Sequence, residues 1–404
     1  MSEEKCCLAP ITTHGRFGLE RENLRVNTDG SLALTPHPTV FGDKLTNPEI
    51  TTDFSESQIE LVTPVALSIP QMLIHEERLT RSVFKGISPE LLWPLSTPPT
   101  GLPAEEQIPI ADFGPAGQDK NDYRAYLSNK YGRLKQLYCG IHFNFSFPRE
   151  EMGLSLNHAA DRNHFYLNLA ANTMRGRFFL VHLLAASPET VEGVSYRSIR
   201  LSSRGYKNTR PVYPDYSTLR AYIASIRSAV EHGQIESPRE LYQLIRIKGP
   251  GFEDLSSEPD ASRIELRIPD LNPFFRTGIN PDDLYLMHLY VMWAARQESS
   301  PFDVTAQKEA DSLSDQAALM TVSETLAGAM NRMFDRLHAF VLRNRLPESY
   351  SKALDHAQDR WLNPHLRYAE RITTHQSTEK NGAGMFWANQ MKDFYLRTAG
   401  NRCM

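Results

Sequence analysis

The sequence predicts a mixed α+β fold in which one sheet is built early in the chain and helices dominate late. Four segments alternate apolar and polar residues with a period of two, which is the pattern of strands that bury one face. The stretch from Pro281 onward instead has the apolar spacing of helices. No internal repeat or low-complexity tract interrupts this order.

The four strand-like segments carry polar groups on one side. In the first segment, Glu20 and Glu22 share a face opposite Phe17, Leu19 and Arg21. A solvent-exposed sheet explains such a pair on one isolated strand, but the same polarity in three later segments favours one sheet whose polar face lines a site. The polar positions of those segments are Gln58 and Glu60, then His142, Asn144 and Ser146, then Arg263, Glu265 and Arg267.

Turn and helix signals predict the other elements. Residues 27–30 form a hairpin turn signal, prolines exclude regular structure at residues 93–99, and residues 101–117 form a polar loop long enough to cover a site. We expect residues 1–280 to form a catalytic sheet-and-helix domain, and residues 281–404 a helical part packed on the same domain. Helices are expected at residues 69–84, 122–138, 157–186, 216–232, 282–296, 306–344 with room for one break, and 361–373.

Composition restricts the class of protein. The 404 residues include 44 basic and 48 acidic side chains, a formal charge of −4, which argues against binding to nucleic acid or an anionic membrane surface. No apolar run of about 18 residues and no signal peptide is present, so we expect a cytoplasmic protein. The four cysteines include no Cys-x-x-Cys pair, which predicts neither a disulfide framework nor a zinc site, and Cys139 is expected to be a buried thiol.

The polar positions are suited to a hard metal ion. Several carboxylates with one imidazole and no thiolates favour Mg²⁺ or Mn²⁺ over zinc. Asp53 lies seven residues before Glu60 and is either a further oxygen ligand or a turn or N-cap residue. Arg267 beside Glu265 either stabilises charge on a transferred phosphoryl group or forms a cross-strand ion pair. The sequence has no phosphate-binding P-loop and no convincing Gly-x-Gly-x-x-Gly motif, so a nucleotide would be held through metals and arginines.

Six groups of residues occur in the order found in one known family. They are Gly18-Leu19-Glu20-Arg21-Glu22-Asn23-Leu24-Arg25-Val26; Thr51-Thr52-Asp53-Phe54-Ser55-Glu56-Ser57-Gln58-Ile59-Glu60-Leu61-Val62-Thr63-Pro64; Trp93-Pro94-Leu95-Ser96; Lys130-Tyr131-Gly132 with Gly140-Ile141-His142-Phe143-Asn144-Phe145; Arg200 with Gly205-Tyr206-Lys207-Asn208; and Glu265-Leu266-Arg267 with Asp270-Leu271-Asn272-Pro273-Phe274. Over roughly residues 16–280 the chain resembles bacterial glutamate–cysteine ligases, most closely the ligase half of bifunctional glutathione synthetases. No ATP-grasp module follows, so the second step of glutathione synthesis is not expected.

The resemblance implies a glutamine-synthetase-like antiparallel sheet surrounded by helices, and a ligase that uses ATP and Mg²⁺ or Mn²⁺. ATP would phosphorylate the γ-carboxylate of glutamate, and the amine of cysteine would attack the acyl phosphate. The implied metal ligands are Glu20, Glu22, Asp53, Glu60, His142 and Glu265. The implied catalytic residues are Arg267, Glu265 and Arg200, the substrate-binding residues are Phe54, Tyr206, Arg200 and Lys130, and the ATP-binding residues are Asn144, Arg267 and Lys130.

The identity of the acceptor amine stays open. Residues 244–249 lack the further tyrosine sought for the acceptor pocket, and the helical region after about residue 300 contains little that matches the family. A ligase acting on another amino acid or amine would keep the metal and phosphate residues. The same residues are also compatible with a non-catalytic protein that binds ATP and metal, and with a metal-dependent hydrolase. The sequence does not predict an oligomeric state.

Overall fold

The protein is built around one antiparallel sheet. The computed structural model describes residues 12–149, 157–255, 257–378 and 382–397. Within these residues, seven strands pair in the order β2-β3-β1-β5-β9-β8, with β4 added beside β1, which confirms the predicted α+β class. The strands are β1 (Arg16–Val26), β2 (Ile50–Thr51), β3 (Gln58–Val62), β4 (Leu91–Leu92), β5 (Ile141–Ser146), β8 (Ile245–Lys248) and β9 (Arg263–Leu266).

The register of the sheet separates an apolar face from a polar face. Leu19 of β1 lies opposite Phe143 of β5, and Phe143 lies opposite Leu266 of β9, so these buried side chains share one face. One residue further along β1, Glu20 lies opposite His142 on the other face. Because side chains alternate along a strand, this register confirms the polar and apolar faces predicted from the sequence.

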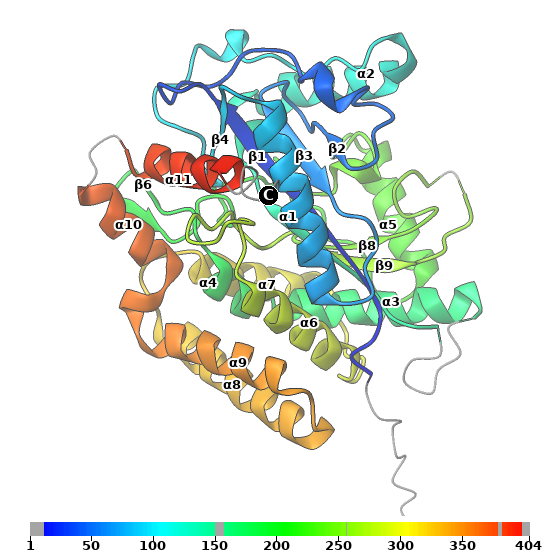
Figure 1. The fold of residues 1–404 in the computed structure, drawn as a ribbon. Coiled ribbons are helices and arrows are strands. Elements are labelled where there is room, and N and C mark those ends of the chain that lie inside the picture. The colour runs from blue at the N-terminus through cyan, green and yellow to red at the C-terminus, as the bar shows by residue number, and fades with distance from the viewer. Residues whose placement is uncertain (1–11, 150–156, 256, 379–381, 398–404) are drawn as a thin grey trace, which may run out of the picture.

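Helices cover the apolar face. α1 (Ile69–Gly86) packs on β1 and β3, and its first turn is capped by the Ser68 hydroxyl, which accepts from the Gln71 amide. α6 (Pro281–Ala295) contributes His288, whose ring lies 4.9 Å from the Phe17 ring and 4.3 Å from the Phe145 ring. Figure 1 shows the hairpin of α8 (Glu324–Asn344) and α9 (Glu348–Leu362) at the end of the molecule opposite α2 (Gln118–Tyr131).

Most of the predicted helices are confirmed with shifted ends. α1 and α6 lie where the sequence predicted helices, and the break allowed within residues 306–344 falls between α7 (Val304–Ala317) and α8. The remaining helices are α3 (Ala159–Arg175), α4 (Phe178–Leu184), α5 (Leu219–Glu231), α10 (Tyr368–Thr378) and α11 (Ala383–Arg397). Among the described residues after α6, the regular structure is helical, while the predicted domain boundary near residue 280 stays a prediction.

Two predictions of helix bounds were wrong, and three short strands were missed. α2 ends at Tyr131 rather than near residue 138, because Gly132 has a φ of +79° that a helix cannot contain. The helix predicted over residues 361–373 is divided between α9 and α10, because Pro364 interrupts the chain between them. The short strand β8 and the hairpin of β6 (Glu189–Val191) and β7 (Val194–Tyr196) were not predicted.

Other sequence expectations have simple outcomes. Cys139 is fully buried as predicted, whereas Cys6, Cys7 and Cys403 lie outside the described residues.

α11 packs against α1 and β4, where the Tyr395 ring stacks on Phe84 with centroids 5.4 Å apart. Among the helices of the described residues, none combines the length and the apolar character required to cross a bilayer.

The assignment of the two sheet faces predicts the effect of Leu19→Ala. Leu19 is 1% exposed on the apolar face, so its truncation should lower the free energy of unfolding by roughly 2–5 kcal/mol. Leu67→Ala is the control, because Leu67 is 69% exposed and its truncation should cost about 0.5 kcal/mol or less. Urea unfolding followed by circular dichroism measures both, and equal values for the two variants would contradict the assigned faces.

Candidate active site

The polar face of the sheet gathers acidic side chains from four strands. Glu20 lies opposite His142, Glu22 lies opposite Glu60, and Asn144 lies opposite Glu265 in the strand register. These pairings place β1, β3, β5 and β9 side by side, so residues that are up to 245 positions apart in the chain share one surface. The sheet therefore brings together the acidic residues that the period-two pattern placed on one face.

Glu20, His142 and Glu265 form a cluster that can hold a metal ion. One ligand atom from each residue lies within 4.8 Å of the others. His142 Nδ1 lies 3.1 Å from Glu20 Oε2 and 3.9 Å from Glu265 Oε1. Glu265 is buried, and its Oε2 atom has no hydrogen-bond partner among the described residues. A buried carboxylate oxygen without a donor is costly unless a cation binds it, so the donor set fits a divalent ion.

A second group of carboxylates lies beside this cluster. His142 Nε2 lies 3.7 Å from Glu22 Oε1, so the imidazole stands between the two groups. Burial raises the pKa of Glu60 well above its usual range, and the charges of Asp53 and Glu22 raise this pKa further. Burial also raises the pKa of Glu22. Bound cations would relieve the repulsion between these carboxylates.

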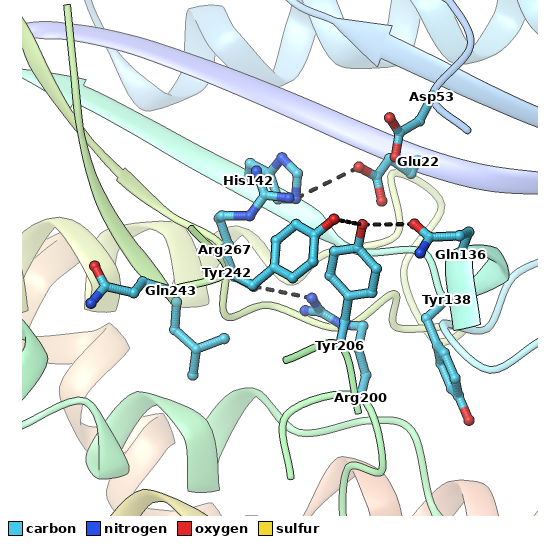
Figure 2. Close-up of a pocket in the computed structure, with 11 residues that line it drawn as sticks. Glu22, Asp53, Gln136, Tyr138, His142, Arg200, Tyr206, Tyr242, Gln243 and Arg267 are labelled. Atoms are coloured by element: carbon cyan, nitrogen blue, oxygen red, sulfur yellow. Dashed lines mark hydrogen bonds and ion pairs between the residues drawn. The ribbon is translucent and has the colours of Figure 1, made fainter. Parts of the chain in front are cut away.

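Asp53 belongs to the same cavity. In the described residues no helix begins at Asp53, which excludes an N-cap role, and its side chain lines the cavity together with Glu22 and His142. Figure 2 shows Asp53 beside Glu22 at one end of this cavity. The Arg124 guanidinium donates to the Asp53 carbonyl at 2.5 Å and thereby holds the backbone of the loop.

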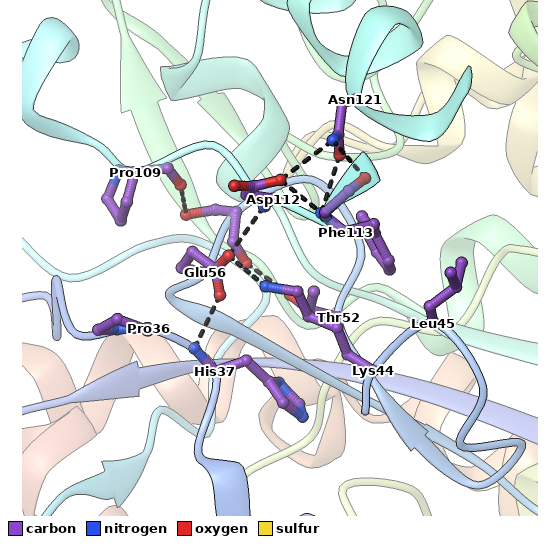
Figure 3. A network of polar contacts seen from close by, with 12 residues as sticks. Pro36, His37, Lys44, Leu45, Thr52, Glu56, Pro109, Asp112, Phe113 and Asn121 are labelled. Atoms are coloured by element: carbon purple, nitrogen blue, oxygen red, sulfur yellow. Dashed lines mark hydrogen bonds and ion pairs between the residues drawn. The ribbon is translucent and has the colours of Figure 1, made fainter. Parts of the chain in front are cut away.

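The loop that carries Asp53 is anchored through Glu56. The Glu56 carboxylate accepts from the backbone amides of His37 (2.7 Å) and Asp112 (2.8 Å) and from the Lys44 ammonium. Figure 3 shows that these contacts join three chain segments around one carboxylate. The polar loop predicted to cover a site thus packs against the Asp53 loop through Asp112.

Gln58 supports the loop from its other side. Its Oε1 atom accepts from the amides of Phe54 (3.0 Å) and Ser55 (2.9 Å), and its Nε2 atom donates to the Gln136 carbonyl at 2.9 Å. Gln58 lies on the polar face as the sequence predicted, but all of these contacts are to backbone. Its role is therefore to shape the loop that carries Asp53.

Two guanidinium groups face the carboxylates. Arg267 Nη1 lies 3.5 Å from Glu265 Oε1, and the charges of Glu265 and Glu22 overcome burial and raise the pKa of Arg267. Arg200 donates through Nε to Asp270 at 2.7 Å and through Nη1 to the Arg267 carbonyl at 3.1 Å. Both arginines line the cavity, as Figure 2 shows. The cavity thus combines an acidic side with a cationic side.

Two glycines pack against Arg200 where a larger residue would not fit. A Cβ atom at Gly140 would lie 2.7 Å from Arg200 Cζ, and one at Gly205 would lie 2.0 Å from the Arg200 carbonyl oxygen. Both separations are too short for a side chain, so the two glycines permit the backbone to pack around Arg200. The glycines at 140 and 205 thus have a physical reason in the structure.

Two tyrosines form the opposite wall. The Tyr206 hydroxyl donates to Gln136 Oε1 at 2.7 Å and lies 2.8 Å from the Tyr242 hydroxyl, and the two rings are 4.1 Å apart. Sequence reasoning missed Tyr242, because the further tyrosine was sought within residues 244–249. Tyr242 lies two positions before that range, just ahead of the unpredicted strand β8, and recognising that strand would have drawn attention to it.

Six predicted residues do not line this cavity: the metal-ligand candidates Glu20, Glu60 and Glu265, and also Asn144, Phe54 and Lys130. Asn144 lies beside the metal cluster, because its amide donates to Glu20 Oε1 at 3.0 Å. Phe54 is buried and does not line the cavity. Lys130 does not line it either, because its ammonium donates to Glu240, Tyr126 and the Gln234 carbonyl. The structure therefore does not bring Lys130 to the position predicted for phosphate contact.

Comparison with known proteins finds similarity to one family. The sequence profile described as glutamate-cysteine ligase matches residues 5–197. The glutathione biosynthesis bifunctional protein GshAB of Listeria welshimeri is 36% identical over 98% of this chain and 56% of its own length. The GshAB protein of Desulfotalea psychrophila is 39% identical over 75% of this chain and 42% of its own length.

Residues 5–197 thus match the glutamate–cysteine ligase family, and the similarity to GshAB proteins extends over up to 98% of the chain. The chain spans about half the length of the curated relatives that it matches. Since the match to the Listeria protein covers 98% of this chain, the helical region after residue 300 also aligns, although few of its residues matched the family in the sequence.

Solved structures share the fold. A bifunctional glutathione synthetase from Pasteurella multocida superposes with a TM-score of 0.85, at 26% identity, over 96% of this chain and 53% of that chain. A glutamate–cysteine ligase from Francisella tularensis, solved in complex with AMP, has a TM-score of 0.84 at 22% identity, covering 96% of this chain and 90% of that chain. Each comparison covers 96% of this chain, which confirms the predicted fold.

The acidic cluster predicts the metal affinity of a Glu265→Gln variant. The substitution removes one anionic ligand with little change in volume, so we expect Mn²⁺ to bind at least about tenfold more weakly. Isothermal titration with MnCl₂ measures the affinity, and circular dichroism checks that the fold persists. Glu298→Gln is the control, because Glu298 is exposed and lies outside the cluster. An unchanged dissociation constant for Glu265→Gln would remove Glu265 from the metal site.

Proposed function

We propose that this protein joins the γ-carboxylate of L-glutamate to the amine of L-cysteine with hydrolysis of ATP to ADP and phosphate, giving γ-glutamylcysteine, the first step of glutathione synthesis. The observation that carries the proposal is the position of the Glu20–His142–Glu265 cluster beside the cavity that Arg267 and Arg200 line: His142 belongs to both, and Arg267 Nη1 lies 3.5 Å from Glu265 Oε1. Similarity to the glutamate–cysteine ligase family supports the same reaction.

The acidic residues would hold Mg²⁺ or Mn²⁺. Glu20, His142 and Glu265 would form one ligand set, and Glu22, Asp53 and Glu60 would supply the neighbouring carboxylates. When bound, the ions would screen the negative charges of ATP and of the substrate carboxylate and would bridge phosphate oxygens. Asn144 would hold Glu20 in place through its amide and lie near the bound nucleotide.

The arginines would stabilise the charge that moves during phosphoryl transfer. A carboxylate is a poor acyl donor until it becomes a mixed anhydride, and Arg267 would face the phosphoryl group that passes from ATP to the glutamate oxygen. Arg200 would bind the acyl substrate or its phosphate, since hydrogen bonds to Asp270 and to backbone carbonyls already fix its guanidinium. Fixed donors lose little entropy when the substrate arrives.

The tyrosine wall would bind the acceptor. Tyr206 and Tyr242 would contact the amino acid whose nitrogen attacks the acyl carbon, whereas buried Phe54 does not line the cavity. In that step the C–N bond forms, the C–O bond to phosphate breaks, and the nitrogen loses a proton. Because these residues touch the acceptor and not the metal, they set which amine is used.

Cytosolic location remains a prediction from the sequence, as does action on small molecules without nucleic acid or membrane partners. The helices of the described residues include no candidate membrane span. A cytosolic ligase would meet ATP, glutamate and cysteine in the same compartment.

ADP release with product analysis by mass spectrometry tests the proposal. Purified protein with ATP, Mg²⁺ and glutamate should release ADP when cysteine is added, and the product should be γ-glutamylcysteine. Turnover with another amine alone would keep the chemistry and change the acceptor. Tight ATP binding without ADP release under any acceptor would favour a non-catalytic protein, and phosphate release without an amine would favour a hydrolase.

Arg267→Lys should lower kcat by roughly a hundredfold, because the charge stays but the planar fork that matches phosphate oxygens is lost. The temperature at which the Arg267→Lys variant unfolds should change little. Arg162→Lys is the matched control, since Arg162 forms a two-point pair with Asp260 through two 2.8 Å contacts outside the cavity. Loss of folding in Arg267→Lys would instead support a structural ion pair as the role of Arg267.

A further inference from the structure

Glu240 is a fully buried carboxylate that none of the proposed steps uses. It ends the short 3₁₀ helix η6 (Pro238–Glu240) and is 0% exposed. Its Oε1 atom accepts from the Lys130 ammonium at 2.5 Å and from the Tyr131 hydroxyl. Its Oε2 atom accepts from the Tyr126 hydroxyl at 3.0 Å and from the Glu236 amide at 2.6 Å. Four donors therefore converge on one carboxylate.

The Lys130 ammonium makes all of its hydrogen bonds within the same cluster. Besides Glu240, its ammonium donates to the Tyr126 hydroxyl and to the Gln234 carbonyl, both at 2.8 Å. An ammonium has three donors, so all of them are used by the protein. This explains why the structure does not bring Lys130 into the cavity, and it leaves the ion pair without a direct role toward a ligand.

Asn208 connects the ion pair to the tyrosine wall. Its Nδ2 atom donates to the Glu240 carbonyl at 2.6 Å and to the Tyr131 hydroxyl at 3.2 Å. Its Oδ1 atom accepts from the backbone amide of Tyr242 at 3.0 Å. Asn208 is also two residues after Tyr206. Its side chain therefore joins the segment that carries Tyr206 and the segment that carries Tyr242 to Glu240.

Ring contacts reinforce this connection. The Tyr131 ring lies 5.5 Å from the Tyr242 ring, and Tyr242 in turn packs on Tyr206 with centroids 4.1 Å apart. Tyr131 is the last residue of α2, and its hydroxyl meets both Glu240 and Asn208. The positions of both wall tyrosines therefore depend on the Glu240 cluster, whereas the metal cluster is held by the strand register of the sheet.

We infer that Glu240, with Lys130, is a positioning residue that sets the affinity for the amine acceptor by holding Tyr206 and Tyr242. The inference rests on the proposed ligase function. It separates two parts of one cavity: the sheet holds the groups for metal and phosphate, and the Glu240 cluster holds the wall that meets the acceptor. A substitution at Glu240 should therefore change the KM for the acceptor more than the KM values for ATP and glutamate.

The decisive variant is Glu240→Gln in the full chain. A glutamine amide would bring its own N–H toward groups that already donate, so the cluster must rearrange. We expect the KM for the acceptor to rise about tenfold, as the loss of one well-placed hydrogen bond would produce, with the KM values for ATP and glutamate within about twofold of wild type.

Asp283→Asn is the matched control. Asp283 is a similarly buried carboxylate that accepts from Arg360 at 2.5 Å and from the Tyr368 hydroxyl at 2.8 Å, in the helical part of the chain. The control should match Glu240→Gln in thermal destabilisation without a selective change in the acceptor KM. If both variants change the three KM values in the same way, Glu240 has only a general structural role and the inference is overturned.

Tyr131→Phe decides the question if Glu240→Gln does not fold. It removes one hydroxyl between Glu240 and Asn208 without altering any charge, so a smaller rise in the acceptor KM alone is expected. An unchanged acceptor KM in this variant would overturn the inference. If the wild-type protein shows no turnover, the proposed function itself has failed, which is a different result from an active wild type with insensitive variants.

Discussion

The concentration of negative charge on one face of the sheet is the constraint on which the site depends. Glu20, Glu22, Glu60 and Glu265 approach one another because adjacent antiparallel strands align them in register. Burial weakens the solvation that would otherwise screen their repulsion, and the raised pKa values of Glu22 and Glu60 express this cost. A fold that keeps these side chains together needs cations opposite them, and Arg267 and Lys248 both lie within ion-pair distance of Glu265.

The apolar face of the same sheet supplies the rigidity that this arrangement requires. Phe17, Phe143 and Phe145 pack beneath the strands, and helices α1 and α6 cover them. Because each strand alternates its side chains, a slip of one residue would bury the carboxylates and expose the phenylalanines. The hydrophobic core therefore protects the register of the polar face as well as the stability of the fold.

Loops complete the site through buried carboxylates that act as anchors. Glu56 joins three segments around the Asp53 loop, Asp270 fixes Arg200, and Glu240 joins the end of α2 to the segment that carries Tyr242. In each case one carboxylate accepts from donors on separate parts of the chain. Such anchors give loops a defined position that their own backbone cannot provide, so side chains on loops can meet side chains on the sheet with fixed geometry.

The sequence by itself determined the two faces of the sheet and the acidic set, because period-two alternation is a local property of each strand. Glu20, Glu22, Glu60, His142 and Glu265 could be found in this way, and the order of the motifs indicated the family. The destination of Lys130 and the presence of Tyr242 in the wall were decided only by tertiary structure. Lys130 carries the same charge in either role, and only the approach of Glu240, 110 residues away, directs it into an ion pair. Tyr242 reaches the cavity because strand β8 pairs with β9, a long-range contact that four residues of local pattern do not specify.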